Sequence, residues 1–163
     1  MDIDRSAVYA AESAAFDGTD LEDQRQFEQL ADLTVSMTTC PWWPGPVVAV
    51  RLARRDARSS STRCDADRRL ESTTISLASE QLTTATLAHE LAHALAGVRR
   101  GHDATFRAAY LDVVAVMTNL DPRDRRRNLH VAQLGSAFEA AGLDVGSRHW
   151  SAPPASVAGP IAL

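Results

Sequence analysis

The chain of 163 residues is predicted to fold as one α+β domain, in which a small sheet of a few strands packs against several helices. Apolar residues recur at helical spacing over most of the chain, and two short stretches, 47–54 and 73–78, have the pattern of strands. The 45% apolar content provides a core at this length. Residues 1–145 are assigned to the domain, and residues 146–163, rich in proline and glycine, to a flexible tail.

The first third of the chain is expected to be helical. Residues 4–16 place apolar side chains on one side of a helix, and residues 17–20 then supply a turn with an N-cap. A second helix is predicted over 21–37 by the same periodicity. The segment 40–46 contains three prolines and a glycine and must end it.

The middle of the chain is expected to form the sheet. Residues 47–54 alternate apolar and other side chains, and 73–78 is rich in β-branched residues, so each predicts a strand. The later strand is expected to offer a sheet edge to an extended substrate. Between them, the polar stretch 55–72 predicts a solvated loop. Trp42 and Trp43 are expected to fill the junction between helices and sheet, in preference to facing a substrate.

A helix with Ser79 as its N-cap is predicted to run through Leu87–Val98, LAHELAHALAGV. It contains His89, Glu90 and His93 in the pattern H-E-x-x-H, which is typical of zinc-binding helices in metallohydrolases. Residues four apart differ by only about 40° around a helix, so both imidazoles can reach one zinc ion. Glu90, about a quarter-turn away, is expected to be a general base. The opposite face is apolar and carries Leu87, Leu91, Ala94, Leu95 and Val98.

Two further helices are predicted after the H-E-x-x-H helix. That helix is expected to end near 97–101, where glycines and arginines suit a C-terminus. Apolar spacing over 106–117 predicts the next helix, and Asp121–Pro122 stops it. A short basic turn at 123–127 then leads to a last helix over 129–141.

A catalytic zinc ion usually has three protein ligands and one open position. His102, which follows a glycine turn after the H-E-x-x-H helix, is the preferred third ligand. The compact spacing of a third histidine found in some such enzymes would need position 99, which is Arg99. Asp103, Asp112 and Glu139 remain as alternative ligands.

Composition excludes several other classes of protein. The net charge of −4 and the pI of about 5.7 argue against a protein that coats nucleic acid. No stretch is long and apolar enough to span a bilayer, and the first residues lack the pattern of a secretory signal, so a cytoplasmic location is expected. Cys40 and Cys64 form no C-x-x-C pair and are expected to be reduced.

The residues His89–Leu95, Gly101–Asp103 and Phe106 carry a family resemblance. They resemble the H-E-L-A-H-A-L … G-H-x-x-x-F arrangement of SprT-like zinc metallopeptidases, and of short metallohydrolase-like proteins of actinobacteria and their phages. The resemblance covers about residues 73–117. It implies a zincin-like fold, Zn²⁺ as the cofactor, zinc ligands at His89, His93 and His102, and Glu90 as the catalytic residue.

The expected reaction is hydrolysis of a peptide bond, in which zinc activates water and Glu90 takes its proton. The expected partner is a protein or peptide; nucleic acid is not indicated, no membrane is expected, and the oligomeric state is left open. A zinc hydrolase of a small amide or of nucleic acid and a non-catalytic zinc module are the alternative functions. The donor that stabilises the oxyanion is not assigned, with Tyr110, Arg107, His130 and His149 as candidates.

Overall fold

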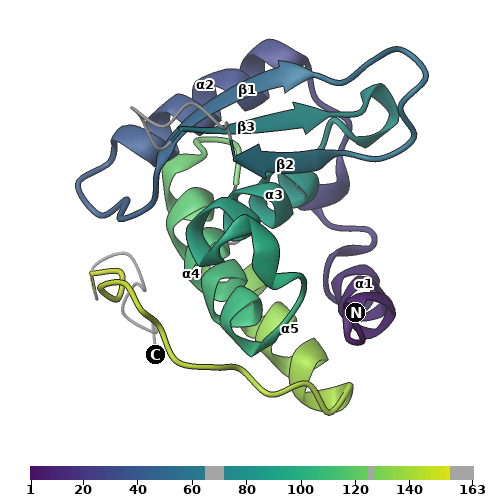
Figure 1. The fold of residues 1–163 in the computed structure, drawn as a ribbon, viewed down its shortest axis with the longest axis vertical. Helices are drawn as coiled ribbons and strands as arrows, with labels where there is room; N and C mark the ends of the chain where they lie inside the picture. The colour runs from purple at the N-terminus through teal and green to yellow at the C-terminus, as the bar shows by residue number, and fades with distance from the viewer. Residues whose placement is uncertain (65–71, 125–126, 155–163) are drawn as a thin grey trace.

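The computed structural model describes residues 1–64, 72–124 and 127–154 and has the predicted α+β architecture (Figure 1). In this part of the chain, five α-helices accompany a three-stranded sheet. They are α1 (Arg5–Phe16), α2 (Phe27–Thr39), β1 (Val47–Leu52), β2 (Ser61–Cys64), β3 (Ser72–Leu77), α3 (Thr84–Ala96), α4 (Ala104–Leu120) and α5 (Arg127–Ala140). Three single-turn helices lie between them: η1 (Asp20–Glu22), η2 (Ser79–Gln81) and η3 (Val98–Arg100). None of the described helices is long and apolar enough to cross a membrane.

The sheet has the order β1-β3-β2, with β1 parallel and β2 antiparallel to β3. Val50 and Thr62 are both paired with Ile75, so the three side chains point to one face of the sheet. Ile75 is fully buried on this face, against the helices. The opposite face is polar, and Arg51 there donates a hydrogen bond to Ser76 (3.0 Å). Figure 1 shows β2 as the edge strand nearest α3.

The hydrophobic core lies between the sheet and α3 and continues between α1, α4 and α5. Of the apolar face predicted for the H-E-x-x-H helix, Leu87, Leu91, Ala94 and Leu95 are buried, whereas Val98 lies beyond the helix in η3 and is half-buried. Large side chains from nearly every element join them: Phe16, Leu30, Met37, Ile75, Phe106, Tyr110, Met117 and Phe138. The helix that carries the histidines is therefore fixed along its whole apolar side.

The second helix begins later than the sequence predicts. Instead of one helix over 21–37, the chain forms the turn η1 and then an extended stretch, and α2 starts at Phe27. The Thr19 side chain accepts a hydrogen bond from the Leu21 N–H and caps η1. The Arg25 N–H donates to the carbonyl of Leu82 (2.7 Å), a tertiary contact that competes with helix formation here.

The H-E-x-x-H helix also starts at a different cap. Ser79 begins the single turn η2, whereas the N-cap of α3 is Thr83. The Thr83 side chain accepts a hydrogen bond from the Thr86 N–H (3.1 Å). Since several Ser and Thr residues precede the helix, the sequence alone does not distinguish the true cap from its neighbours.

The predicted loop over 55–72 contains a strand that the sequence analysis missed. The strand β2 pairs with β3 within this stretch, while residues 65–71 lie outside the described residues. As a consequence, β3 is the central strand of the sheet, and the prediction that it forms the edge was wrong. The edge beside α3 is β2.

The chain after α5 packs more closely than predicted for a tail. Asp112 on α4 accepts hydrogen bonds from Arg148 (2.5 and 2.9 Å) and from the Trp150 indole (2.8 Å). The Gly146 N–H donates to the carbonyl of Ala104 (2.8 Å). Within the predicted tail, residues 146–151 are therefore held against the domain, and residues 155–163 lie outside the described part of the chain.

The two adjacent tryptophans pack against the core in the junction before β1, as the sequence predicts. The Trp43 indole donates to the carbonyl of Pro46 (2.9 Å), which closes the proline-rich turn. The Trp42 indole donates to the carbonyl of Ser151 (2.9 Å). This second bond connects the junction to the segment that follows α5.

Candidate metal centre

Three histidines converge in the structure, and they are the three that the sequence singled out. His89 and His93 come from α3, and His102 from the turn before α4. The Nε2 atom of His89 lies 3.1 Å from that of His93 and 3.0 Å from that of His102. Within the described residues, this is the group of potential ligands compact enough to hold one ion, with its ligand atoms all within 4.8 Å of one another.

The turn between α3 and α4 places His102 beside α3. Gly97 and Gly101 both have positive φ, at 112° and 64°, which lets the chain reverse on either side of η3. Asp103 then caps α4 by accepting a hydrogen bond from the Phe106 N–H (2.9 Å). Because this cap follows His102 directly, the start of α4 and the position of the imidazole are fixed together.

Two carboxylates form hydrogen bonds with the Nδ1 atoms of His89 and His102. Glu12 on α1 lies 2.9 Å from His89 Nδ1, and Asp2, before α1, lies 2.5 Å from His102 Nδ1. A carboxylate at Nδ1 makes that nitrogen the donor and leaves the lone pair on Nε2. The sequence analysis missed both carboxylates, which lie 77 and 100 residues from their histidines.

The donor set fits a zinc ion. With protons on Nδ1, the Nε2 lone pairs of His89 and His102 face each other at 3.0 Å with no proton between them. A cation resolves this repulsion, and neutral imidazole nitrogens are among the ligands that zinc prefers. Three protein ligands also leave one coordination position open.

The three imidazoles differ in basicity. Burial, with the charges of His89 and His102, lowers the pKa of His93 to about 3. Burial also lowers the pKa of His102, although the hydrogen bond to Asp2 opposes it. At His89, burial acts in the same direction, but the hydrogen bond and charge of Glu12 outweigh it and raise the pKa. A metal ion therefore competes with a proton chiefly at His89.

Glu90 lies next to the histidine group and is only 6% exposed. The Thr62 hydroxyl, from β2, is 2.5 Å from Glu90 Oε2 and 3.0 Å from the Glu90 carbonyl oxygen. Burial raises the pKa of the Glu90 carboxyl, against the effects of His89 and of the Thr62 hydrogen bond. A carboxylate with a raised pKa and one oxygen held by a hydroxyl is suited to accept a proton through its other oxygen.

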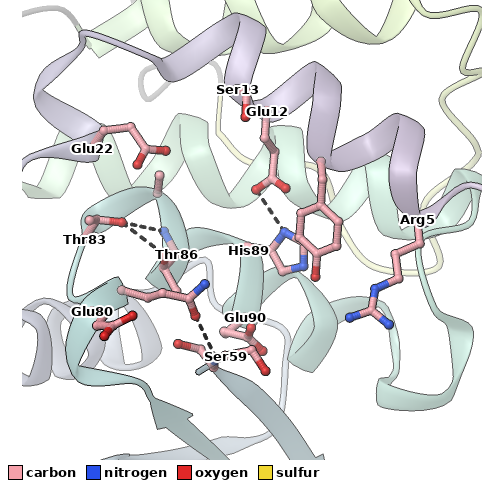
Figure 2. Close-up of a pocket in the computed structure, with 14 residues that line it drawn as sticks. Arg5, Glu12, Ser13, Glu22, Ser59, Glu80, Thr83, Thr86, His89 and Glu90 are labelled. Carbon is pink, nitrogen blue, oxygen red and sulfur yellow. Dashed lines mark hydrogen bonds and ion pairs between the residues drawn. The ribbon is translucent and has the colours of Figure 1, made fainter. Parts of the chain in front are cut away.

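His89 and Glu90 open onto a cleft of about 400 Å³ between α1, η1, η2 and the start of α3. Figure 2 shows Arg5 at one end of this cleft, with Glu22 and Glu80 at the other and His89 and Glu90 between them. Arg5 is the one basic side chain among the lining residues, apart from the imidazole. Four glutamates line the cleft, namely Glu12, Glu22, Glu80 and Glu90. The cleft is therefore acidic.

Tyr9 on α1 also lines the cleft, and its side chain was not singled out from the sequence. Its ring stacks on that of His89, with centroids 5.4 Å apart and an interplanar angle of 5°, and lies 5.3 Å from the His102 ring. The Arg5 guanidinium lies 5.7 Å from the Tyr9 centroid. Burial raises the pKa of Tyr9, so its hydroxyl keeps its proton at neutral pH.

The residues of the first segment that lie at the candidate site share a spacing that could have revealed them. Asp2, Arg5, Tyr9 and Glu12 are separated by three, four and three residues, which corresponds to one face of a helix and its N-terminal extension. The sequence analysis used only the apolar side of this helix, on which Val8, Ala11 and Ala15 are buried.

The alternative ligands lie outside the histidine group. Asp103 caps α4 and pairs with Arg100 (3.3 Å), Asp112 holds Arg148 and Trp150, and Glu139 is exposed on α5. Both cysteines are free thiols, half-buried at Cys40 and exposed at Cys64, and neither joins the group.

The four candidate oxyanion donors do not line the cleft. The buried Tyr110 hydroxyl donates to Glu12. Arg107 is buried and donates to the carbonyl of His102 (2.8 Å). His130 is fully buried beside Asp124 (3.3 Å), and His149 is exposed against Trp150.

The chain matches no protein-family model, no curated protein and no solved structure.

Proposed function

We propose that this protein is a zinc-dependent metallopeptidase with a zincin-like core. The observation that supports this most strongly is that His89 and the buried carboxylate of Glu90 line the same cleft. A substrate that enters the cleft therefore meets a ligand of the candidate metal centre and a candidate base together.

His89, His93 and His102 would hold the zinc ion. When bound, zinc supplies Lewis acidity and lowers the pKa of a water molecule. Glu90 accepts a proton from the attacking water and passes it to the leaving amine of the substrate. The Thr62 hydroxyl occupies Oε2 of Glu90, so the other oxygen, Oε1, performs this transfer.

Tyr9 and Arg5 are assigned to the developing negative charge on the substrate carbonyl. Both line the cleft, and the Tyr9 ring lies against two of the three imidazoles. A phenol that keeps its proton and a guanidinium are both hydrogen-bond donors to an oxyanion. In this assignment they replace the four candidates taken from the sequence.

The character of the cleft favours a peptide over the alternative substrates. Its four glutamates repel the phosphates of a nucleic acid, since only Arg5 opposes them. The edge strand β2, which holds Glu90 through Thr62, is suited to pair with an extended peptide. A purely structural zinc site normally has four protein ligands, whereas the group in the described residues has three.

The test is the variant Glu90→Gln, measured for zinc content after dialysis and for cleavage of a mixture of quenched fluorescent peptides. Zinc should remain stoichiometric, and the rate should fall by about 10²-fold or more because the amide accepts no proton. The control is Glu28→Gln, an exposed glutamate on α2. Retained turnover in Glu90→Gln would remove Glu90 from the mechanism, and cleavage of oligonucleotides in place of peptides would favour the alternative substrate.

A further inference from the structure

The segment 2–4, which precedes α1, lies against the turn that carries His102. Both oxygens of Asp2 are used there: Oδ2 is 2.5 Å from His102 Nδ1, and Oδ1 accepts a hydrogen bond from the His102 backbone N–H (3.3 Å). One carboxylate therefore fixes the imidazole and the backbone of the same residue. Such a two-point contact determines the direction in which the ring points.

Gly101 provides the space for this contact. A Cβ atom at position 101 would lie 2.9 Å from Asp2 Cγ, closer than such atoms approach, and φ at Gly101 is +64°. Glycine is therefore required both by the backbone conformation and by the close approach of Asp2. The turn is shaped to receive the carboxylate.

A second contact of the same segment holds the other side of His102. Asp4 Oδ2 lies 2.8 Å from Arg107 Nη1, and Arg107 Nη1 also donates to the carbonyl of His102 (2.8 Å). Arg107 is only 4% exposed, so Asp4 supplies the negative charge that its buried guanidinium needs. Asp2 and Asp4 together hold His102 at its ring, its N–H and, through Arg107, its carbonyl.

We propose that docking of the segment 2–4 controls zinc affinity, with Asp2 as the positioning residue for the third ligand, His102. This inference rests on the proposed function, since it assumes that the histidine group holds zinc. His102 directly follows Gly101, which has positive φ, and its ring packs against Phe106 (centroids 4.9 Å apart), whereas its Nδ1 is held by Asp2. When the segment is undocked, α3 still presents His89 and His93, and the site loses its third ligand.

This arrangement makes zinc occupancy adjustable. Glu12, which holds His89, is part of the regular helix α1, whereas Asp2 precedes the helix and its side chain is 30% exposed. Binding or modification of the segment 2–4 can therefore release His102 while α1 and His89 stay in place.

The experiment compares the zinc affinity of the full-length chain with that of Asp2→Ala, by competition with a chromophoric chelator. Loss of a carboxylate behind a histidine ligand typically weakens metal affinity by about 10–100-fold. The zinc-free variant should stay folded with an unchanged helical circular-dichroism spectrum, and its unfolding temperature should fall by only a few degrees, because the two hydrogen bonds of Asp2 to His102 are lost while the helices are left in place. The cobalt-substituted variant should also show an altered visible absorption spectrum, which reports on the ligand set. The matched control is Asp23→Ala, which removes the same charge at another exposed site.

The variant Asp4→Ala provides a second test, because Asp4 touches no histidine. It should weaken zinc binding in the same direction but less than Asp2→Ala, since it frees Arg107 and leaves the Asp2 contact in place. The inference would be overturned if Asp2→Ala bound zinc with an affinity within about twofold of the parent and had an unchanged cobalt spectrum. The proposed function would then remain intact. A parent chain that does not bind zinc would overturn both.

Discussion

Among the individual side chains of the site, the three imidazoles are not equivalent. His89 and His102 each have a carboxylate at Nδ1, whereas within the described residues His93 packs its ring against Phe106, with centroids 4.4 Å apart. A carboxylate at Nδ1 increases the basicity of the imidazole, and an aromatic neighbour does not. His93 is thus the weakest base of the group, in agreement with its pKa of about 3.

The stability of the zinc-free protein is expected to decrease as the pH falls below about 6.5. The pKa of His93 is about 3 in the folded state and 6.5 ordinarily, so between these values the unfolded chain binds more protons. The lowered pKa of His102 acts in the same direction. The raised pKa of His89 has no opposing effect there, because its stabilisation is already complete below the ordinary pKa. The raised pKa values of the Glu90 and Glu22 carboxyls do act in the opposite direction, so the contribution of His93 is read from its own variant.

This dependence can be measured by urea unfolding of the zinc-free protein between about pH 6.5 and 5. His93→Gln should reduce the dependence on pH, since it removes the group that resists protonation. His149→Gln, at an exposed histidine, should leave it unchanged. An equal dependence on pH in the parent and in His93→Gln would contradict the assignment of the lowered pKa to His93.

The hydroxyl of Tyr9 is expected to act in catalysis. Tyr9→Phe keeps the ring that stacks on His89 and removes the hydroxyl alone. Loss of one oxyanion donor typically lowers kcat by about 10²-fold. KM and zinc content should stay unchanged, because neither depends on the phenol. Tyr9→Ala, which also removes the stacked ring, separates the two contributions. If kcat is normal in Tyr9→Phe, the Tyr9 hydroxyl is not the oxyanion donor, and Arg5 remains as the candidate.

How well each site residue could be predicted depends on how far it lies in the sequence from the residues that it contacts. The grouping of His89, Glu90 and His93 was predictable because it depends only on the geometry of one helix. His102 required a turn marked by glycines, a weaker signal. Asp2 and Glu12 were not predictable, since their contacts span 100 and 77 residues and depend on how α1 packs.

Among the secondary structure elements, β2 connects the sheet to the proposed chemistry. Its four residues, Ser61–Cys64, show no apolar alternation and lie within the polar stretch 55–72, so the sequence favoured a loop. The strand forms because β3 offers it a partner along one edge, a tertiary effect that overrides local composition. The antiparallel register turns Thr62 toward the helices and so toward Glu90.

Thr62 is expected to position Glu90 through its hydroxyl. Thr62→Val keeps the shape of the side chain but removes the hydrogen bond to Glu90 Oε2, so kcat should fall by roughly tenfold while KM and zinc content stay the same. Thr62→Ser retains the hydroxyl and should restore most of the activity. If Val and Ser variants have equal kcat values, the hydroxyl does not position the base.

On the scale of the whole molecule, the cleft collects negative charge from separate parts of the chain. Glu12 comes from α1, Glu22 from η1, Glu80 from η2 and Glu90 from α3. The net charge of −4 did not predict this cluster of glutamates, because a total charge does not say where the charged residues lie in the fold. Partial desolvation of the Glu22 carboxyl raises its pKa, with the nearby carboxylates of Asp17 and Glu12 adding to the shift, although the residue as a whole is exposed.

Peptides with basic residues are therefore expected to be better substrates than acidic ones. Glu22→Gln and Glu80→Gln should each lower kcat/KM for basic peptides by roughly fivefold, and added salt should reduce the preference. Neutral peptides should be affected little. Glu139→Gln, at an exposed position on α5, is the control. An equal loss for acidic and basic peptides would show that charge does not select the substrate.

The carboxylates that orient the rings lie 77 and 100 residues before their histidines, so only the folded chain brings each carboxylate to its imidazole. A growing polypeptide displays the H-E-x-x-H stretch before α4 is complete, and an excised peptide displays it with no carboxylates behind it. Neither has the means to retain an ion firmly. Under the proposed function, loading with zinc is therefore expected to require the tertiary structure, and an isolated peptide of the H-E-x-x-H helix should bind the ion only weakly.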